Sequence, residues 1–187
     1  MTKRIKLADR VLPTYSIGEE ITNTATHVLG LVGGIIALIL CVRKAGDLYG
    51  PTEIAAAAIY GSCLMLLYSA SSLYHAMKPS LTKKVLQIID HCAIYFLIAG
   101  SYTVVSLGAL RRADPELGWG ILPFFRQVYA ILSPVGFYLL LAGGIAYTIG
   151  AVVYGIGSRV RWMHSVFHIF VVIGSVLHFF AFYFYGL

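Results

Sequence analysis

Apolar residues fill five long stretches of this chain, and short polar segments separate them. A helix that crosses the hydrocarbon core of a membrane, about 30 Å thick, needs roughly 20 mostly apolar residues. The stretches that meet this requirement are residues 21–42, 52–75, 88–110, 128–157 and 163–187. The pattern predicts an all-α, polytopic integral membrane helical bundle with five clear spans. We expect residues 1–20 to form a polar N-terminal arm and residues 21–187 to form a single transmembrane helical domain.

Two parts of the pattern are irregular. The fourth apolar stretch contains Pro134 and the pair Gly143 and Gly144, which predicts a kink and close packing against a neighbouring helix. Residues 111–127 are interrupted by charged residues and prolines, so they are too polar and broken to cross lipid alone. We expect this segment to form a loop with an interfacial turn around Trp119 and Phe124.

Composition and charge place the chain among membrane proteins and orient it. Hydrophobic residues make up 59% of the sequence and charged residues 12%, with a formal net charge of +6. The basic residues lie in the short polar segments, so the positive-inside rule explains them better than a nucleic-acid partner does. With the N-terminus inside, nine of the 14 basic residues lie on the inner side. These are Lys3, Arg4, Lys6, Arg10, Lys78, Lys83, Lys84, Arg159 and Arg161. We therefore expect a multi-pass protein of the plasma (inner) membrane with a cytoplasmic N-terminus.

Three histidines stand inside membrane-length apolar stretches. His75 ends the second stretch, and His164 and His168 lie one helical turn apart at the start of the last. Ionisable residues in membrane spans are costly and usually functional. Two histidines on one helix face and a third from another helix could hold zinc with an open fourth position, the pattern of catalytic sites. The alternative is that these imidazoles bond backbone carbonyls or each other.

The expected topology brings these groups to one level of the membrane. The second stretch runs inward and ends at His75, whereas the third and the last begin on the inner side, near Asp90 and near His164 and His168. Orientation came from loop charges and the spans came from hydropathy, so this convergence is an independent result. We expect a metal centre at the inner face.

Two further residues could take part in chemistry at such a centre. Ser71 lies one turn before His75 on the same helical face and could orient a metal-bound water, although serines in membrane helices often bond their own backbone. Asp90 could act as a general base or position the water. Its alternative role is that of a carboxylate favoured by the dipole at the start of a helix.

Other polar residues share these spans without an assigned role. Glu20, Asn23 and His27 recur on one face at the start of the first span, where they could buttress the site, bind a second group or form a solvated helix entrance. We keep His27 outside the metal set. His178 lies roughly 15 Å beyond His168 along the helix, too far to bind the same ion, and a single interhelical hydrogen bond is the preferred explanation for it.

Taken together, the motifs resemble a known family. The chain is similar to the haemolysin III branch of the progestin and adipoQ receptor family, in a superfamily shared with the alkaline ceramidases. The similar segments are the SxxxH of Ser71 and His75, the HxxxH of His164 and His168, and residues 19–27, 90–95, 142–150 and 176–179. The resemblance implies zinc on His75, His164 and His168, with Ser71 and Asp90 near a zinc-bound water, at a site that faces the cytoplasm.

The chain departs from the family in one respect. Family members have seven spans, whereas residues 111–127 are too short for the usual fourth and fifth. The loss of two consecutive crossings leaves every later span on its original side. The metal site is therefore expected to survive, although helices that would wall its cavity are either missing or were omitted from this chain.

These observations leave three functions open. The first is a zinc-dependent hydrolase, ceramidase-like, that cleaves the amide or ester bond of a membrane lipid at the inner interface. The second is a receptor or sensor in which Zn²⁺ is structural and a lipid is the ligand. The third is a haemolysin-type protein that perturbs membranes, which the family name alone suggests.

Overall fold

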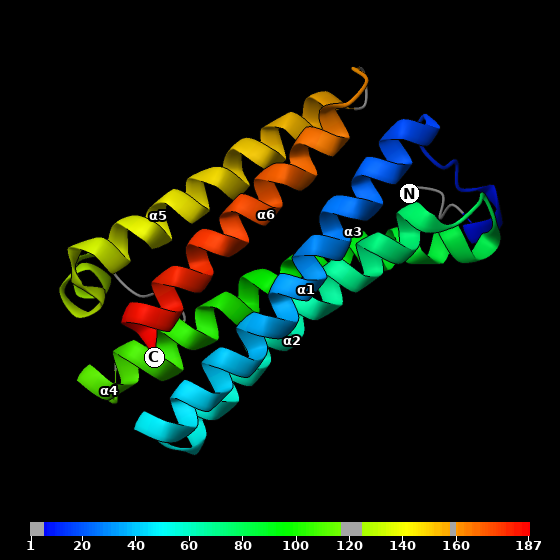
Figure 1. Ribbon diagram of the computed structural model, residues 1–187. Helices are drawn as coiled ribbons and strands as arrows, with labels where there is room; N and C mark the ends of the chain where they lie inside the picture. The colour runs from blue at the N-terminus through cyan, green and yellow to red at the C-terminus, as the bar shows by residue number, and fades with distance from the viewer. Residues whose placement is uncertain (1–5, 117–124, 158–159) are drawn as a thin grey trace.

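The computed structural model describes residues 6–116, 125–157 and 160–187, and every element in those ranges is helical (Figure 1). Five helices are long and apolar enough to cross a membrane. They are α1 (Ile17–Leu48), α2 (Pro51–Ala76), α3 (Leu81–Thr103), α5 (Phe125–Gly157) and α6 (Met163–Ala181). A π-helical segment, η2 (Val104–Leu110), continues α3 into the short α4 (Arg111–Ala113), and η4 (Phe182–Gly186) ends α6. A single 3-10 turn, η1 (Leu7–Asp9), lies in the N-terminal arm.

The long helices run up and down, so the chain ends and connections gather at two ends of the bundle. Figure 1 shows the N-terminal arm, the connection from α2 to α3 and the start of α6 at one end. The connection from α1 to α2 and the C-terminus lie at the other. Helix α1 packs against α2 and α6, α3 packs against α2, and α5 packs against α6. This arrangement confirms the predicted polytopic helical bundle.

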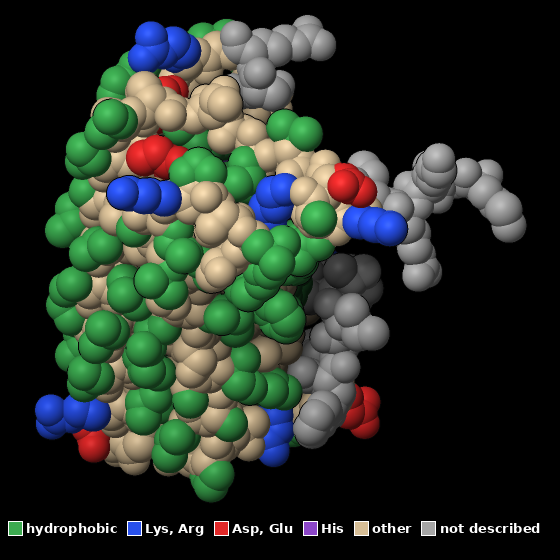
Figure 2. All heavy atoms as spheres, turned by 90° about the vertical axis from the view of Figure 1, so that its right-hand side faces the viewer, with side chains coloured by type: hydrophobic (Ala, Val, Ile, Leu, Met, Phe, Trp, Pro, Cys, Tyr) green, Lys and Arg blue, Asp and Glu red, His purple; other side chains and the backbone are tan. Residues whose placement is uncertain are grey.

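The surface has the polarity that a lipid environment requires. Figure 2 shows hydrophobic side chains over the middle of one face, with the charged side chains gathered towards its two ends. Large apolar residues such as Tyr95, Phe96 and Ile98 of α3 remain strongly exposed. In water such exposure would be costly, whereas lipid is as apolar as these side chains.

The helices are longer than the apolar stretches that predicted them, because backbone hydrogen bonding continues through charged residues. Helices α1 and α2 are separated only by Tyr49 and Gly50, so residues 43–48, which lie between the first two predicted spans, are helical. The ammonium group of Lys44 donates to the backbone carbonyl of Tyr183 at the end of the bundle.

Asp90 does not open its helix. Helix α3 begins at Leu81, where the Ser80 hydroxyl accepts a hydrogen bond of 3.1 Å from the backbone N–H of Lys83. Asp90 therefore lies in the third turn, beyond the unpaired N–H groups of a helix start. This position removes the helix-start explanation of the carboxylate.

The irregular fourth span is kinked as predicted. Ser133 has φ 62° and ψ 163°, and this break stands directly before Pro134 inside α5. Gly143 also packs closely, because a Cβ atom added there would collide with the His178 ring of α6. Residues 117–124 lie outside the described part of the chain, and with them the expected turn around Trp119 and Phe124.

Candidate metal centre

The three predicted histidines meet at the end of the bundle that carries the N-terminal arm. His75 comes from the last turn of α2, and His164 and His168 come from the first two turns of α6. Their side chains are buried, with 2%, 5% and 1% of their surface exposed. One ring nitrogen from each lies within 4.8 Å of the others, the only such group of three potential metal ligands among the described residues.

The distances within this cluster suit a metal ion. His164 Nε2 lies 3.2 Å from His75 Nε2 and 3.1 Å from His168 Nε2. Two imidazole nitrogens that bind one tetrahedral zinc ion at about 2.0–2.1 Å lie about 3.4 Å apart. A ring nitrogen carries either one hydrogen or one lone pair, so His164 Nε2 cannot form good hydrogen bonds to both neighbours. A cation that accepts three lone pairs satisfies all three nitrogens, and the cluster therefore fits a divalent metal.

The start of α6 is fixed by α1. Glu19, in the first turn of α1, forms a capping box with Ser16, and its Oε1 accepts a hydrogen bond of 2.7 Å from the backbone N–H of Trp162. Trp162 precedes α6 and has a left-handed conformation with φ 68°. Gly18 lies under the indole ring, which a Cβ atom there would approach to 3.2 Å. These contacts set the position of His164, two residues further on.

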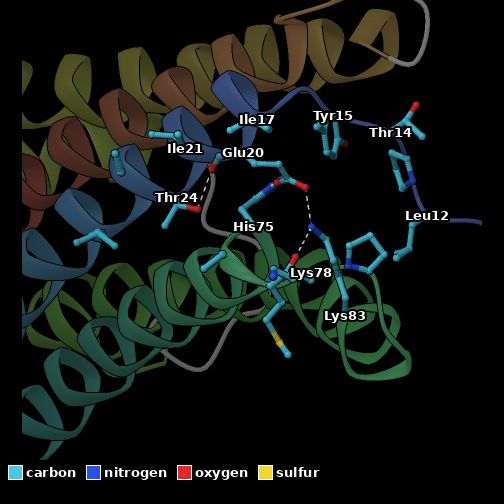
Figure 3. A pocket seen from close by; sticks show the side chains of 16 residues that line it. Leu12, Thr14, Tyr15, Ile17, Glu20, Ile21, Thr24, His75, Lys78 and Lys83 are labelled. Atoms are coloured by element: carbon cyan, nitrogen blue, oxygen red, sulfur yellow. Dashed lines mark hydrogen bonds and ion pairs between the residues drawn. The ribbon is translucent and has the colours of Figure 1, made fainter.

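A carboxylate outside the cluster orients His75 (Figure 3). Glu20 Oε2 accepts a hydrogen bond of 2.6 Å from His75 Nδ1, and Glu20 Oε1 lies 2.6 Å from Lys83 Nζ. The bond places the hydrogen on Nδ1 and leaves the Nε2 lone pair directed at the cluster, as in carboxylate–histidine–metal sites. Asn23 Nδ2 lies 3.4 Å from the same Nδ1. Three roles were open for the polar face of α1: support of the site, binding of a second group, and a solvated helix entrance. For Glu20 the structure favours the first, because its carboxylate holds the ring of His75.

Asp90 and Ser71 lie beside the cluster. The Asp90 carboxylate interacts electrostatically with His75 and with His164, and it faces Ser71. Ser71 is fully buried, and its hydroxyl makes no hydrogen bond of regular geometry, so it does not bond its own helix backbone. The Ser71 hydroxyl and the Asp90 carboxylate thus form a polar pair beside the cluster, where a water molecule or a substrate oxygen could contact them.

Two further histidines, His27 and His178, lie outside the cluster and have different contacts. The His27 ring stacks on His168 with centroids 3.7 Å apart and planes at 18°, and neither of its nitrogens has a hydrogen-bond partner. His27 supports the ring of His168 from outside the group of three. His178 lies near mid-span, where its Nε2–H donates to the carbonyl of Leu140 on α5 at 3.2 Å. This is the interhelical bond that the sequence favoured.

Two residues at the centre were not singled out from the sequence. Lys83 was counted only among the inner basic residues, yet it is 3% exposed and bonds both Glu20 and the carbonyl of Met77. Tyr15, in the arm, stacks its ring on His164 with centroids 4.9 Å apart and planes at 24°. Burial raises the pKa of the Tyr15 phenol well above its usual value, so this hydroxyl is neutral.

One cavity connects the cluster to the apolar surface. It has a volume of about 350 Å³ and is lined by Asp90 and by the histidines His27, His91 and His164, together with mostly apolar residues of α2, α3, α5 and α6. Tyr95, which lines its rim, is 72% exposed on the lipid-facing side of α3. A hydrogen bond of 2.8 Å between His91 Nε2 and the Tyr154 hydroxyl spans the gap between α3 and α5.

Fold and centre together define a polytopic helical membrane protein with a buried three-histidine cluster at one end of its spans. Comparison with known proteins then gives the family. The chain belongs to the haemolysin-III related family, which matches residues 15–117 and 116–179. No solved structure matches the chain.

The chain is also similar to individual proteins over most of its length. The chain is 33% identical to the hemolysin-3 homolog of Bacillus subtilis (strain 168), over 91% of this chain and 96% of that protein. It is 32% identical to hemolysin-3 of Bacillus cereus, over 93% and 94%. With the human monocyte to macrophage differentiation factor it shares 25% identity, over 97% of this chain and 89% of that protein.

The alignments also bear on the short middle segment. The alignment with the Bacillus subtilis relative covers 205 positions, more than the 187 residues of this chain, so this chain has gaps within it. The two family matches meet at residues 116–117. Both observations agree with a family segment that is absent near residues 111–127.

Proposed function

We propose that this protein is a zinc-dependent hydrolase that cleaves the amide or ester bond of a lipid at the inner interface of the plasma membrane. The observation that carries the proposal is the buried three-histidine cluster with the Asp90 carboxylate and the buried Ser71 hydroxyl beside it. A zinc ion with three protein ligands keeps its fourth position open, which is the pattern of catalytic rather than structural sites.

The residues divide the chemical tasks. A zinc ion on His75, His164 and His168 would supply a water of lowered pKa and polarise the acyl carbonyl. Asp90 accepts the proton of the attacking water and returns it to the leaving amine or alcohol. Ser71 donates a hydrogen bond that orients the water or the carbonyl oxygen.

The cavity beside Asp90 supports a lipid as the substrate. Its walls are mostly apolar, and its rim at Tyr95 lies on the surface that faces the acyl chains of the membrane. A lipid whose head group lies at the interface could bring its scissile bond to Asp90 without leaving the bilayer. Because nine of the basic residues lie at this end of the expected topology, we assign it to the cytoplasmic face.

The test combines metal analysis with lipid analysis. Purified wild-type protein should contain stoichiometric zinc, and the Asp90→Asn variant should keep both the zinc and the fold. Membranes that contain wild type should show a changed lipid pool relative to membranes with the His164→Ala, His168→Ala double variant. Asp90→Asn should resemble the double variant in its lipids. Wild-type protein without zinc, or identical lipid pools, would refute the proposal.

A receptor or sensor with structural zinc is the second candidate. One feature of the cluster supports this candidate. Its ligands come from α2 and α6, which lie in different parts of the bundle, so a bound ion would hold these two helices together. Such a protein would be indifferent to Asp90→Asn, yet it would lose its fold in the His168→Ala variant. A haemolysin-type function is supported only by the names of the two bacterial relatives.

A further inference from the structure

The N-terminal arm crosses the end of the bundle directly over the histidine cluster. Tyr15 stacks on His164, and its ring centroid lies 5.6 Å from that of His75. One residue therefore contacts ligand rings from both helices that build the cluster. The stack lies on the arm side, whereas the cavity beside Asp90 opens on the lipid side.

The arm is tied down at a second point, on α3. Arg10 Nε donates a hydrogen bond of 2.8 Å to Gln87 Oε1, and Lys84 Nζ bonds the carbonyl of Ala8. From there the arm runs to Ser16, where the capping box starts α1. Tyr15 lies within this strap, held at both ends by contacts that involve no metal ligand.

Two cavities lie on either side of the strap. One, of about 880 Å³, reaches His75 beside Glu20 and Lys83 and continues along exposed apolar residues of α1 as far as Val28 (Figure 3). The other, of about 1020 Å³, reaches His164 beside Arg161. Tyr15 lines both. Each cavity touches only one ligand, and the three ligand side chains are at most 5% exposed. The ring of Tyr15 thus stands between the aqueous phase and the point at which the ligands converge.

We propose that Tyr15 is a specificity-determining residue, which closes the metal centre to water-soluble molecules and leaves the cavity beside Asp90 as the route for lipids. The inference rests on the proposed metal centre and deepens it, since it explains how a site next to water would act on membrane lipids alone. A soluble ester or chelator has to displace the arm, whereas a molecule dissolved in the bilayer does not.

Two chelators test this without any turnover. The full-length protein is loaded with zinc in lipid nanodiscs, and zinc release is followed with water-soluble EDTA and with membrane-permeant 1,10-phenanthroline. In the Tyr15→Ala variant, release to EDTA should rise about tenfold or more, because a local barrier is gone, while release to phenanthroline stays within about twofold. Tyr15→Phe keeps the ring and should behave as wild type. Tyr138→Ala, which removes a 59% exposed tyrosine from α5, is the matched control.

The remaining outcomes are equally decisive. Equal acceleration with both chelators would show that Tyr15 only holds His164 in place, and an unchanged EDTA rate would show that the arm is no barrier. Should Tyr15→Ala fail to fold, Gln87→Ala releases the strap without touching a ligand and should also raise the EDTA rate selectively.

Activity measurements separate this inference from the proposed function. Tyr15→Ala should gain hydrolysis of a charged, membrane-impermeant ester such as 4-acetoxybenzenesulfonate. If wild type and variant cleave no ester or lipid, the proposed hydrolase is wrong, whereas the two chelator rates still decide the role of the arm.

Discussion

Replacing Glu20 by glutamine tests whether the cluster is a metal site that its surroundings orient. The carboxylate makes two contacts of 2.6 Å, one to His75 Nδ1 and one to Lys83 Nζ. Loss of such an outer partner typically weakens metal binding by about 10- to 100-fold, or about 1.4–2.7 kcal/mol. Glutamine keeps one acceptor oxygen but loses the charge, so we expect zinc binding to weaken about tenfold. Glu20→Ala also removes the anionic partner of the buried Lys83, which keeps only the Met77 carbonyl as an acceptor and the Tyr74 ring as a cation–π partner, so its effect should approach about 100-fold.

The measurement is the zinc dissociation constant by competition with a chromophoric chelator in mild detergent. Glu53→Gln is a matched control, because Glu53 is 5% exposed and lies in the first turn of α2, at the other end of that helix from His75. There its Oε2 accepts a bond of 3.3 Å from the Gly50 N–H. Zinc binding that stays within about twofold in Glu20→Gln would refute the orienting role. Equal weakening in Glu53→Gln would point to lost stability instead.

Three further predictions concern stability, measured by thermal unfolding in detergent. Gly30→Ala should lower the free energy of unfolding by about 1–3 kcal/mol, because the new Cβ atom would lie 2.5 Å from the Tyr68 ring. A Cβ atom at Gly33 meets no atom within 4 Å, so Gly33→Ala should raise the free energy of unfolding by up to about 1 kcal/mol. Equal effects of the two substitutions would contradict the packing. Ser16→Ala should cost about 1 kcal/mol through loss of the capping box with Glu19, and an unchanged melting temperature would count against it. Zinc at 100 times its dissociation constant should stabilise the folded protein by about 2.7 kcal/mol, and a chelator should reverse this stabilisation. A wild-type melting temperature that a chelator does not change would argue against the site.

The sequence predicted that His75, His164 and His168 lie close together because lipid limits the possible arrangements. Bilayer thickness sets the length of each span, and alternation of the spans places His75 at the same level as His164 and His168. Polar residues in apolar stretches are rare, so each one stands out. By the same logic, the loss of two consecutive crossings near residues 111–127 would leave the cluster undisturbed, since the chain would return to the same side.

The features that the sequence did not predict depend on contacts between residues that are far apart in the chain. Lys83 pairs with Glu20, 63 positions away, and in the sequence it is one basic residue among several near a helix start. Tyr15 lies in an arm without helical periodicity, so no pattern indicates that its ring covers His164. Helix ends were also misplaced, because hydropathy marks the edge of the hydrocarbon and backbone hydrogen bonding continues beyond it. Asp90 therefore lies within α3 and not at its start.

The position of the ligands along the chain has a consequence for biosynthesis. Tyr15 and Glu20 leave the ribosome first and His75 follows, but two of the three proposed ligands belong to α6, which is made after α1, α2, α3 and α5. The complete set of ligands therefore exists only once these four spans have been synthesised. An ion on the cluster would mark a molecule that has reached this stage, and a cell that removes unmetallated copies would at the same time remove chains terminated before α6.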